Sequence, residues 1–420
     1  LDGNDVFYLT GTDEQRLKIL RAAEKNNLSP KEFCDKISVT FRDLTKTLNL
    51  TNDDFIRTTE ERHYKSVTEI WNRLVKSGDI YLSKYSGWYS VSDEAYYDED
   101  EIEDKEGNKC AISSGSKVDW VEEESYFFKL SKWGPKLLEH YSKNPDFILP
   151  ASRRNEVVEF VKRGLKDLSV SRTSFNWGIP VPNAKNHVIY VWLDALTNYI
   201  SALNFPNEQD NLYKKFWPAT VHFIGKDILY FHALFWPAML HFSGFRTPTS
   251  LYAHGFLTLN GKKMSKSRGT FITARAYLKK NIEAEFLRYY FASKLNGSME
   301  DLDMNMSEFV QKVNGDLVGK FINIQSRCSG FLLRHFDGEI LSQREIVDIN
   351  PIDAKLEGGI EQALEQIKEA YNLRNTSKAI KEIMRLVDQI NNYIQEKKPW
   401  DTAKNIKNIL YVYHLSSFVV

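Results

Sequence analysis

The chain has 420 residues, of which 42% are hydrophobic and 13% aromatic, so it can form two to four packed domains. Its 56 basic and 56 acidic side chains give a formal net charge of zero, which excludes a protein-wide positive field that attracts nucleic acid. Any contact with a polyanion must therefore depend on a local basic patch.

The three cysteines, Cys34, Cys110 and Cys328, are widely separated. This spacing argues against a disulfide framework and excludes a zinc knuckle built from paired cysteines. No apolar run approaches the length of a membrane span, and the first residues do not form a secretory leader. We therefore expect a protein of a reducing compartment, the cytoplasm.

The first part of the chain contains the predicted elements of an α/β domain. Residues 5–10 predict a short buried strand that stops at Gly11, and a charged helix is predicted from near Asp13. The next predicted elements are a helix over 66–76, strands over 80–82 and 87–91, and a solvated acidic hairpin tip over 98–106.

Strands and helices alternate again in the middle of the chain. Residues 187–192 predict a strand, which leads into a helix that contains Tyr199. A second strand is predicted over 221–224 and an aromatic helix over 227–240. Strands that alternate with helices predict a parallel sheet, with ligands at the carboxyl ends of its strands.

The C-terminal part has a different character. Apolar residues keep helical spacing over 360–371 and 380–394, which predicts an antiparallel helical bundle. The sequence opens almost directly on a predicted core strand and stops inside an apolar helical pattern. We therefore expect both ends to continue in a longer protein.

The segment Lys-Met-Ser-Lys-Ser at 263–267 combines two lysines and two serines between glycines. A lysine ammonium on a flexible stem can follow a pyrophosphate as charge develops on it, and serines add neutral donors. The alternative is a solvated basic loop. His254-Gly255 and the Val-His-Phe-Ile-Gly-Lys-Asp run at 221–227 precede the segment, and this order of strand, helix and lysine loop favours a phosphate clamp.

That order resembles the second nucleotide-binding half of class I aminoacyl-tRNA synthetases, and from about residue 5 the chain resembles methionyl-tRNA synthetases. The resemblance implies an α/β fold with a Rossmann-like class I synthetase catalytic domain and an inserted connective domain, followed by an α-helical anticodon-binding bundle. It implies that L-methionine and ATP, with Mg²⁺, form methionyl-adenylate and pyrophosphate, and that the methionyl group then passes to tRNA(Met).

The resemblance also implies domain boundaries. The implied parts are the first part of the catalytic domain at 1–60, the connective insertion at 61–185, the second Rossmann half at 186–252, the lysine loop and linker at 253–318, and the anticodon-binding domain at 319–420. The insertion is too short for the editing domain of the isoleucine, valine and leucine enzymes, and it has no cysteine knuckle. We therefore expect no structural zinc. We also expect the protein to be a monomer in this form.

A methionine pocket is implied around Val-Trp-Leu-Asp-Ala at 191–195, which resembles the family's pocket strand. A thioether is apolar and polarizable, so aromatic edges around a narrow slot suit it. The alternative for each aromatic residue alone is ordinary core packing. Leu196 stands where the family has proline, which reshapes one wall. The implied methionine-binding residues are Asp13, Trp192, Ala195, Tyr199, Ile228, Phe231 and His232.

Asp13 matches the carboxylate with which the family holds the α-ammonium of the substrate. The family continues with histidine and glycine, whereas this chain has Gln15 and Arg16 in this active-site loop. Arg172 and Asp227 match residues that organise the site around the carboxylate and ATP. The alternative for these two is a structural ion pair.

The ATP site is implied by two motifs. His254-Gly255 would lie beside adenine and ribose, where a glycine lets the backbone approach the ring, and the lysine loop would close over the phosphates. The implied ATP-binding residues are His254, Gly255, Lys263, Ser265 and Lys266, and the implied catalytic residues are Lys263, Lys266, Arg172 and Asp227. The substrate carboxylate is itself the nucleophile, so the protein supplies position and charge neutralisation.

The family's first nucleotide signature, His-x-Gly-His, occurs nowhere in the 420 residues. Either the sequence lacks its beginning or the protein is a degenerate relative. The predicted strand at the very start favours the first explanation.

Three residues of the helical part match the family's anticodon readers. Asn323 and Arg327 lie four residues apart, on one helix face, and Trp400 follows Pro399. A tryptophan can stack on an unstacked base while Asn and Arg address its edge and its phosphates. The alternative is that Trp400 caps a helix junction.

The leading functional hypothesis is a methionine–tRNA ligase. The second is a non-catalytic or degenerate tRNA-binding relative of the family. A synthetase for another apolar amino acid is a weaker third, because no insertion of editing size exists. Pyrophosphate exchange that depends on methionine separates the first hypothesis from the second.

Overall fold

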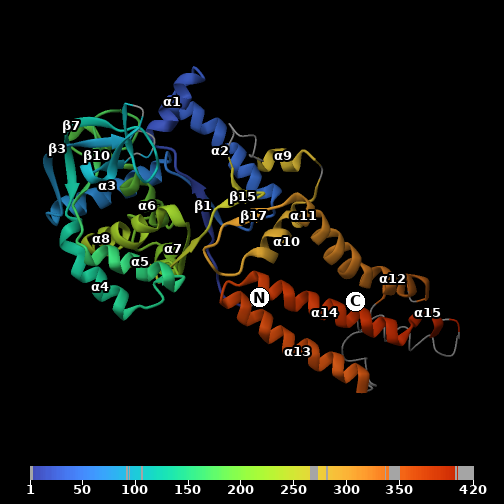
Figure 1. Ribbon diagram of the computed structural model, residues 1–420. Coiled ribbons are helices and arrows are strands. Elements are labelled where there is room, and N and C mark those ends of the chain that lie inside the picture. Colours follow the sequence, from blue (N-terminus) through green and yellow to red (C-terminus); the bar gives the residue numbers. More distant parts are fainter. Residues whose placement is uncertain are drawn as a thin grey trace. The chain divides into compact units, whose positions relative to one another are not determined.

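The computed structural model describes residues 3–90, 93, 95–105, 107–264, 273–280, 282–335, 337–339, 351–402 and 404. Contacts divide the chain into two compact units, Leu1–Ala253 and His254–Val420, whose elements are labelled in Figure 1. Within the described part, none of the helices has the length and apolar character needed to cross a membrane.

The first unit alternates strands and helices at both of its ends and has antiparallel strands between them. Its elements are β1 (Leu9–Thr12), α1 (Leu17–Lys25), α2 (Pro30–Thr47), β2 (Asp54–Arg57), α3 (Glu61–Lys76), β3 (Ile80–Ser90), β4 (Ala95–Tyr97), β5 (Ile102–Lys105), β6 (Asn108–Ala111), β7 (Asp119–Phe128), α4 (Gly134–Lys143), β8 (Ile148–Leu149), α5 (Ala151–Lys162), β9 (Leu168–Ser169), β10 (Ser171–Arg172), β11 (Pro180–Val181), β12 (Ala184–Ile189), α6 (Val191–Ser201), α7 (Asn211–Phe216), β13 (Val221–Gly225), α8 (Trp236–Phe242) and β14 (Ser250–His254).

The strands β1 and β2 run parallel and bring the start of the chain to the site. Gly11 pairs with Ile56 in this ladder, and a Cβ added at Gly11 would lie 2.0 Å from the Ile56 carbonyl oxygen. Only glycine therefore allows the two backbones to approach this closely.

The predicted first strand and helix are displaced from their observed positions. β1 begins at Leu9, not near residue 5, and Val6 and Tyr8 are exposed rather than buried. α1 begins at Leu17, not near Asp13. The reason is local: the Glu14 N–H donates to the Thr58 Oγ1 at 2.9 Å, which holds this loop against β2 in place of a helical turn.

The second parallel pair, β14 and β8, belongs to a three-stranded sheet with β13. Helix α5 contacts β8, and α3 packs on α6 and α8. The strand predicted over 187–192 is wrong at its end, because β12 stops at Ile189 and Trp192 lies in the first turn of α6. The Tyr190 carbonyl accepts the N–H groups of both Leu193 and Asp194, which closes that first turn. β-branched residues favour a strand in this run, but tertiary contacts override the preference.

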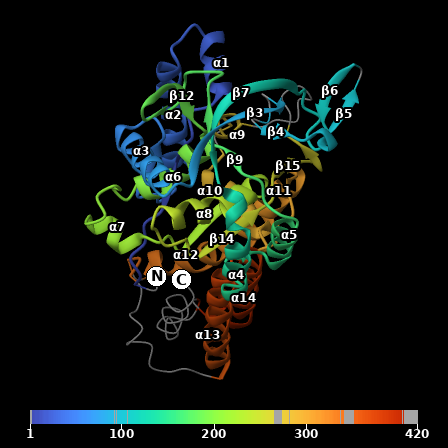
Figure 2. The same ribbon diagram turned by 90° about the vertical axis from the view of Figure 1, so that its left-hand side faces the viewer.

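Between these parts lies the antiparallel sheet β4-β3-β7-β9, in which β3 is one continuous strand rather than the two predicted. The acidic run at 98–105 forms a short 3₁₀ turn and β5, and β5 pairs with β6 as a hairpin that Figure 2 shows beside β4. Gly107, at the hairpin turn, has φ +79°, a conformation that favours glycine.

The second unit joins a small sheet to a set of helices. Its elements are β15 (Leu257–Leu259), β16 (Lys262–Lys263), α9 (Ala274–Leu278), α10 (Ala284–Lys294), β17 (Leu302–Met304), α11 (Met306–Lys312), a π-helical segment (Val313–Ile322), α12 (Asn323–His335), α13 (Pro351–Asn372), α14 (Thr376–Lys397) and α15 (Pro399–Thr402). α13 and α14 lie antiparallel, side by side, in Figure 1. The predicted helical character of this part is confirmed, because its apolar stripe packs one helix on the next.

Candidate active site

A cavity of about 300 Å³ opens in the first unit at the carboxyl end of β1. It is lined by Leu9, Thr10, Gly11, Thr12, Asp13, Arg16, Ile56, Thr58, Trp192, Ala195, Leu196, Asn198, Tyr199, Phe223, Ile228 and His232. Six of the seven residues proposed for methionine are in this wall, although they come from three separate segments of the chain.

One face of α6 supplies the aromatic side of the cavity. Trp192, Ala195 and Tyr199 are three and four residues apart, so they lie on the same side of the helix. Phe231, the seventh proposed residue, lies behind Trp192, with ring centres 3.9 Å apart and planes 11° apart. Stacked and edge-on rings of this kind form a rigid apolar slot.

His232 and Tyr199 are joined by a hydrogen bond whose direction the surroundings determine. The His232 Nδ1 is 3.0 Å from the Ile228 carbonyl oxygen, so Nδ1 carries a proton and donates it. The His232 Nε2 therefore accepts from the Tyr199 hydroxyl at 2.8 Å. Burial lowers the pKa of His232 to about 4, so this ring is neutral at neutral pH.

Asp13 lies at the rim of the cavity and is paired with Arg16. The Arg16 Nε is 2.6 Å and its Nη2 2.5 Å from the Asp13 Oδ2. The guanidinium carbon also lies 5.8 Å from the Trp192 ring centre. Thus the carboxylate proposed for the substrate ammonium already has a cation of the protein beside it.

The rest of this loop is held by buried polar contacts that the sequence does not indicate. The Glu14 carboxylate accepts from Arg57 at 2.8 and 3.0 Å and from the Thr59 hydroxyl at 2.5 Å. The Gln15 side-chain amide donates to the Thr58 carbonyl at 3.2 Å and to the Tyr64 hydroxyl at 2.6 Å. Gln15 therefore anchors the loop, which leaves Arg16 directed at the cavity.

A buried chain of three side chains lies next to the aromatic face of α6. The Ser201 hydroxyl donates to the Thr197 carbonyl at 2.9 Å, so it accepts from the His63 Nδ1 at 3.0 Å. His63 Nε2 and Asp194 Oδ1 then share one proton at 2.6 Å. Burial raises the pKa of the Asp194 carboxyl to about 6, against the opposing effect of the His63 hydrogen bond.

The two other residues proposed to organise this site lie outside the cavity wall. Arg172 is buried in β10, where its Nη1 donates to the Ser169 hydroxyl at 2.8 Å and its guanidinium lies 4.3 Å from the Tyr190 ring centre. Asp227 is exposed in the turn after β13, and a Cβ at Gly225 would meet its Oδ1 at 2.6 Å.

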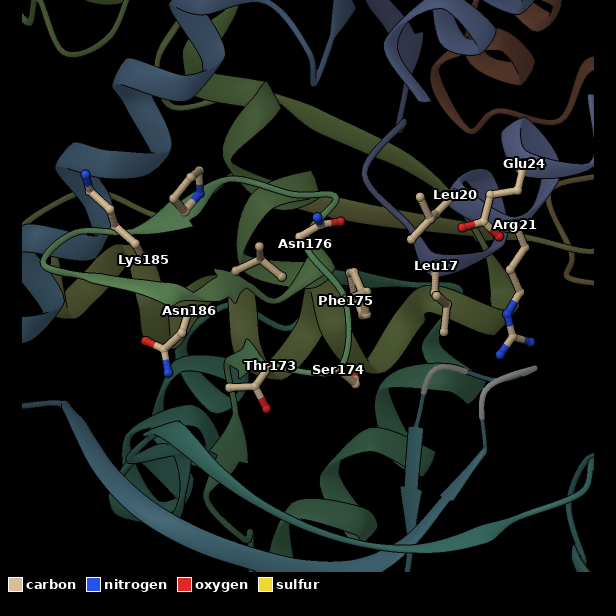
Figure 3. A pocket seen from close by; sticks show the side chains of 12 residues that line it. Leu17, Leu20, Arg21, Glu24, Thr173, Ser174, Phe175, Asn176, Lys185 and Asn186 are labelled. Carbon is tan, nitrogen blue, oxygen red and sulfur yellow. The ribbon is translucent and has the colours of Figure 1, made fainter. Parts of the chain in front are cut away.

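A second, larger cavity of about 510 Å³ lies between α1 and the segments 173–176 and 185–188. Figure 3 shows Phe175 and Asn176 near the centre of the view, with the α1 residues Leu17, Leu20, Arg21 and Glu24 together on one side. None of the residues proposed from the sequence lines it. Most of its lining side chains are exposed, so it is an open groove.

His254 is the last residue of β14, and Gly255 follows it directly. A Cβ at Gly255 would lie 2.2 Å from the Glu300 carbonyl oxygen, so glycine is required there by the chain's own backbone. Lys263 is the last residue of β16. Ser265 and Lys266 lie outside the described residues.

The three proposed anticodon readers come together in the second unit. The Arg327 guanidinium lies 5.1 Å from the Trp400 ring centre, and its Nη1 donates to the Asn391 carbonyl at 3.2 Å. The Asn323 side chain also reaches Asn391. The sequence analysis missed Asn391, which lies on α14 and shows no distinguishing local motif.

Metal-ligating clusters are also absent from the described part of the chain, where no group of three or more His, Cys, Asp or Glu side chains could hold an ion. The three cysteines are free and buried, and burial raises the pKa of Cys34 to about 12.

Comparison with known proteins identifies the family. The family model for class I tRNA synthetases (M) matches residues 1–329. The methionine–tRNA ligase of Rickettsia bellii (strain RML369-C) is 44% identical over 406 residues, which cover 96% of this chain and 78% of that protein. The methionine–tRNA ligase of Rhizobium meliloti (strain 1021) is 41% identical over 416 residues, which cover 98% of this chain and 80% of that protein.

A solved structure agrees in fold. The Mycobacterium tuberculosis methionyl-tRNA synthetase in complex with methionyl-adenylate superposes with a TM-score of 0.93 at 37% identity, over 99% of this chain and 81% of that one. The predicted fold class, a Rossmann-like class I catalytic domain with a helical C-terminal part, is thereby confirmed. The chain therefore belongs to the methionyl-tRNA synthetases, a family of class I aminoacyl-tRNA synthetases.

Proposed function

We propose that this chain is a methionine–tRNA ligase, which activates L-methionine with ATP to methionyl-adenylate and transfers the methionyl group to tRNA(Met). The observation that carries the proposal is the cavity of about 300 Å³, whose wall combines an aromatic slot with one carboxylate. A small zwitterion with an unbranched apolar side chain fits these features. The relatives named above support the same reaction.

In this proposal the thioether lies between Trp192, Tyr199 and the neutral His232, with Ala195 and Ile228 leaving room for it. Sulfur makes favourable contacts with ring edges, and the neutral imidazole avoids a charge in the slot. Asp13 accepts the α-ammonium, because a carboxylate bound to an ammonium forms a charge-assisted hydrogen bond. Phe231 supports the slot from behind Trp192.

For the activation step, we propose that Lys263 and Lys266 neutralise the phosphates, with Lys266 acting on the departing pyrophosphate. Ser265 adds a donor, and His254-Gly255 contacts adenosine. The support is the order of these motifs in the sequence. Mg²⁺ enters with ATP as part of the substrate, where it neutralises phosphate charge.

Arg172 and Asp227 have different support. Arg172 packs on Tyr190, whose carbonyl closes the first turn of α6, so we propose that it positions the aromatic face. Asp227 is exposed at the carboxyl end of β13, where ligands of parallel sheets bind. We propose that Asp227 contacts ATP or its ribose.

We also propose that Asn323, Arg327 and Trp400 bind the anticodon. Their support is the cluster in which Arg327 lies over the Trp400 ring. An aromatic face beside a cation is suited to an unstacked base and its phosphate.

The remaining parts of the proposal concern organisation. We assign 1–60 and 186–252 to the catalytic domain, 61–185 to the connective insertion, 253–318 to the lysine loop and linker, and 319–420 to the anticodon-binding domain. We further propose a monomer without structural zinc. A cytoplasmic location is supported by three free cysteines, which suit a reducing compartment.

The test is exchange of labelled pyrophosphate into ATP, measured with methionine, with leucine and with neither. Exchange that requires methionine supports the proposal, and exchange that leucine supports equally contradicts it. Trp192→Ala should lower the rate of exchange in the presence of methionine. Trp120→Ala should not, because Trp120 is half-exposed and lies outside the cavity wall. In a protein to which the His-x-Gly-His signature has been added, methionine binding without exchange would support the non-catalytic relative instead.

A further inference from the structure

Arg16 gives this pocket a feature that the proposed reaction does not require. Its side chain is about one-third exposed (34%) and that of Asp13 about one-quarter (23%), so both are partly withdrawn from water. The two donated contacts, 2.6 Å from Nε and 2.5 Å from Nη2, converge on one oxygen, Oδ2. The carboxylate that would bind the substrate ammonium is therefore already paired with a cation of the protein.

The other oxygen of the same carboxylate is differently placed. Oδ1 of Asp13 is buried and has no hydrogen-bond partner among the described residues. Asp13 and Arg16 both belong to the cavity wall. An α-ammonium that approached Oδ1 would meet the guanidinium across a single carboxylate, and two like charges at such a distance repel.

The loop keeps Arg16 in this position. Arg16 is the extended residue before α1, with φ −128° and ψ 150°, and its neighbour Gln15 is anchored to Thr58 and Tyr64. The Trp192 face, 5.8 Å from the guanidinium carbon, adds a favourable cation–π contact. The cation is thus held on two sides, by the carboxylate and by the ring.

We propose that Arg16 is a specificity-determining residue of the methionine pocket, whose guanidinium occupies the ammonium subsite at Asp13. Ligands that carry an α-ammonium must displace it or bind beside it, which weakens their affinity. Ligands that carry a carboxylate and no ammonium gain from the same positive charge. This inference rests on the proposed function, because it takes Asp13 as the ammonium acceptor.

The test compares three ligands by calorimetry on the 420-residue protein: L-methionine, methioninol, which keeps the ammonium but lacks the carboxylate, and 4-(methylthio)butanoate, which keeps only the carboxylate. Arg16→Gln removes the charge but keeps most of the stem. We expect the Arg16→Gln variant to bind methioninol roughly fivefold more tightly, because no partly exposed ion pair has to be displaced. The same variant should bind 4-(methylthio)butanoate more weakly. Methionine should bind to the Arg16→Gln variant more tightly than to the unmodified protein.

Two further variants separate charge from side-chain shape. Arg16→Lys retains the charge, so it should rank the three ligands by affinity in the same order as the unmodified protein. Arg21→Gln removes an exposed arginine of α1, the helix that follows Arg16, outside the cavity wall, and should change none of the three affinities. An equal effect of Arg21→Gln would show that net charge, not the Asp13 subsite, is responsible, and would overturn the inference.

The opposite result also has a definite meaning. If Arg16→Gln loses affinity for methionine while methioninol binds unchanged, Arg16 contacts the substrate carboxylate and the inference is wrong. If neither the unmodified protein nor Arg16→Gln binds methionine or methioninol, the proposed function itself fails. The two failures are therefore distinguishable in one set of titrations.

Discussion

Replacing Tyr199 by phenylalanine removes one hydroxyl from the wall of the cavity and leaves the ring in place. The ring stacks on His222, with centres 3.9 Å apart, and this contact needs no oxygen atom. What is lost is the hydrogen bond of 2.8 Å to the His232 Nε2. The variant therefore isolates one polar interaction in an otherwise unchanged aromatic cluster.

The magnitude follows from the position of the acceptor. His232 is 2% exposed, and its Nδ1 is already used by the Ile228 carbonyl, so the ring cannot turn to compensate. A buried acceptor left without a donor costs about 1–3 kcal/mol. We expect the free energy of unfolding to fall by about that amount, and methionine affinity to fall with it, because a bare nitrogen would face the thioether.

The assay is urea unfolding at neutral pH, together with calorimetric titration of methionine. The control is Tyr213→Phe, since Tyr213 is a second buried tyrosine and lies outside the cavity wall. A loss below about 0.5 kcal/mol in Tyr199→Phe, or an equal loss in the control, would refute the assigned hydrogen bond.

Four further predictions concern the reaction, the amino acid, the tRNA and pH. In a protein to which the His-x-Gly-His signature has been added, Lys266→Ala should lower the rate of pyrophosphate exchange by about 10²–10³, with methionine affinity unchanged; an unaltered rate there would make the segment a solvated loop. Leucine should bind more weakly than methionine, and norleucine should compete, because a difference of about one methylene is worth only ~1–3 kcal/mol; equal binding of leucine in calorimetry would contradict this. Trp400→Ala should weaken tRNA binding by ~1–3 kcal/mol and leave exchange intact, whereas an earlier thermal transition with loss of both would indicate a packing role, since Trp400 also packs on the apolar cluster around Cys328. Because burial raises the folded-state pKa of Asp194 from 3.8 to about 6, the stability that this carboxyl contributes is present at low pH and should fall as the pH rises from 4 to 7. Subtracting the pH profile of Asp194→Asn measures that fall, and a rise over this range would contradict it.

Periodicity predicted the helices well, because a 3.6-residue spacing survives packing. The observed α3 contains the whole predicted helix over 66–76, and the stripe over 380–394 lies in α14. Propensity was less reliable where tertiary contacts intervened. The run at 188–192 contains strand-forming residues, yet Trp192 is helical because the Tyr190 carbonyl closes the first turn of α6.

Residues of the candidate site could be predicted where they match a motif of the family. The cavity brings four of them together, Asp13, Trp192, Tyr199 and His232. Their roles stay predictions until ligands are measured. Contacts between distant positions had no signal in one sequence. His63 and Asp194 are separated by 131 residues. Asp194 belongs to the motif at 191–195, but nothing in that motif indicates His63 as its partner.

The position of the Arg16 side chain also could not be predicted. The sequence shows that an unusual residue stands there, but not what its side chain contacts. Only the observed contact with Asp13 shows that the change concerns the ammonium subsite. The lysine of greatest interest, Lys266, lies outside the described residues, so its role depends on the motif alone.

The central claim is that the cavity of about 300 Å³ is the methionine site, and selenomethionine tests it most directly. The ligand would be soaked into crystals of the unlabelled protein, and its selenium located by anomalous scattering. One selenium peak is expected between Trp192, Tyr199 and His232. A peak in the larger cavity beside Leu17 and Phe175, with none in the aromatic slot, would contradict it.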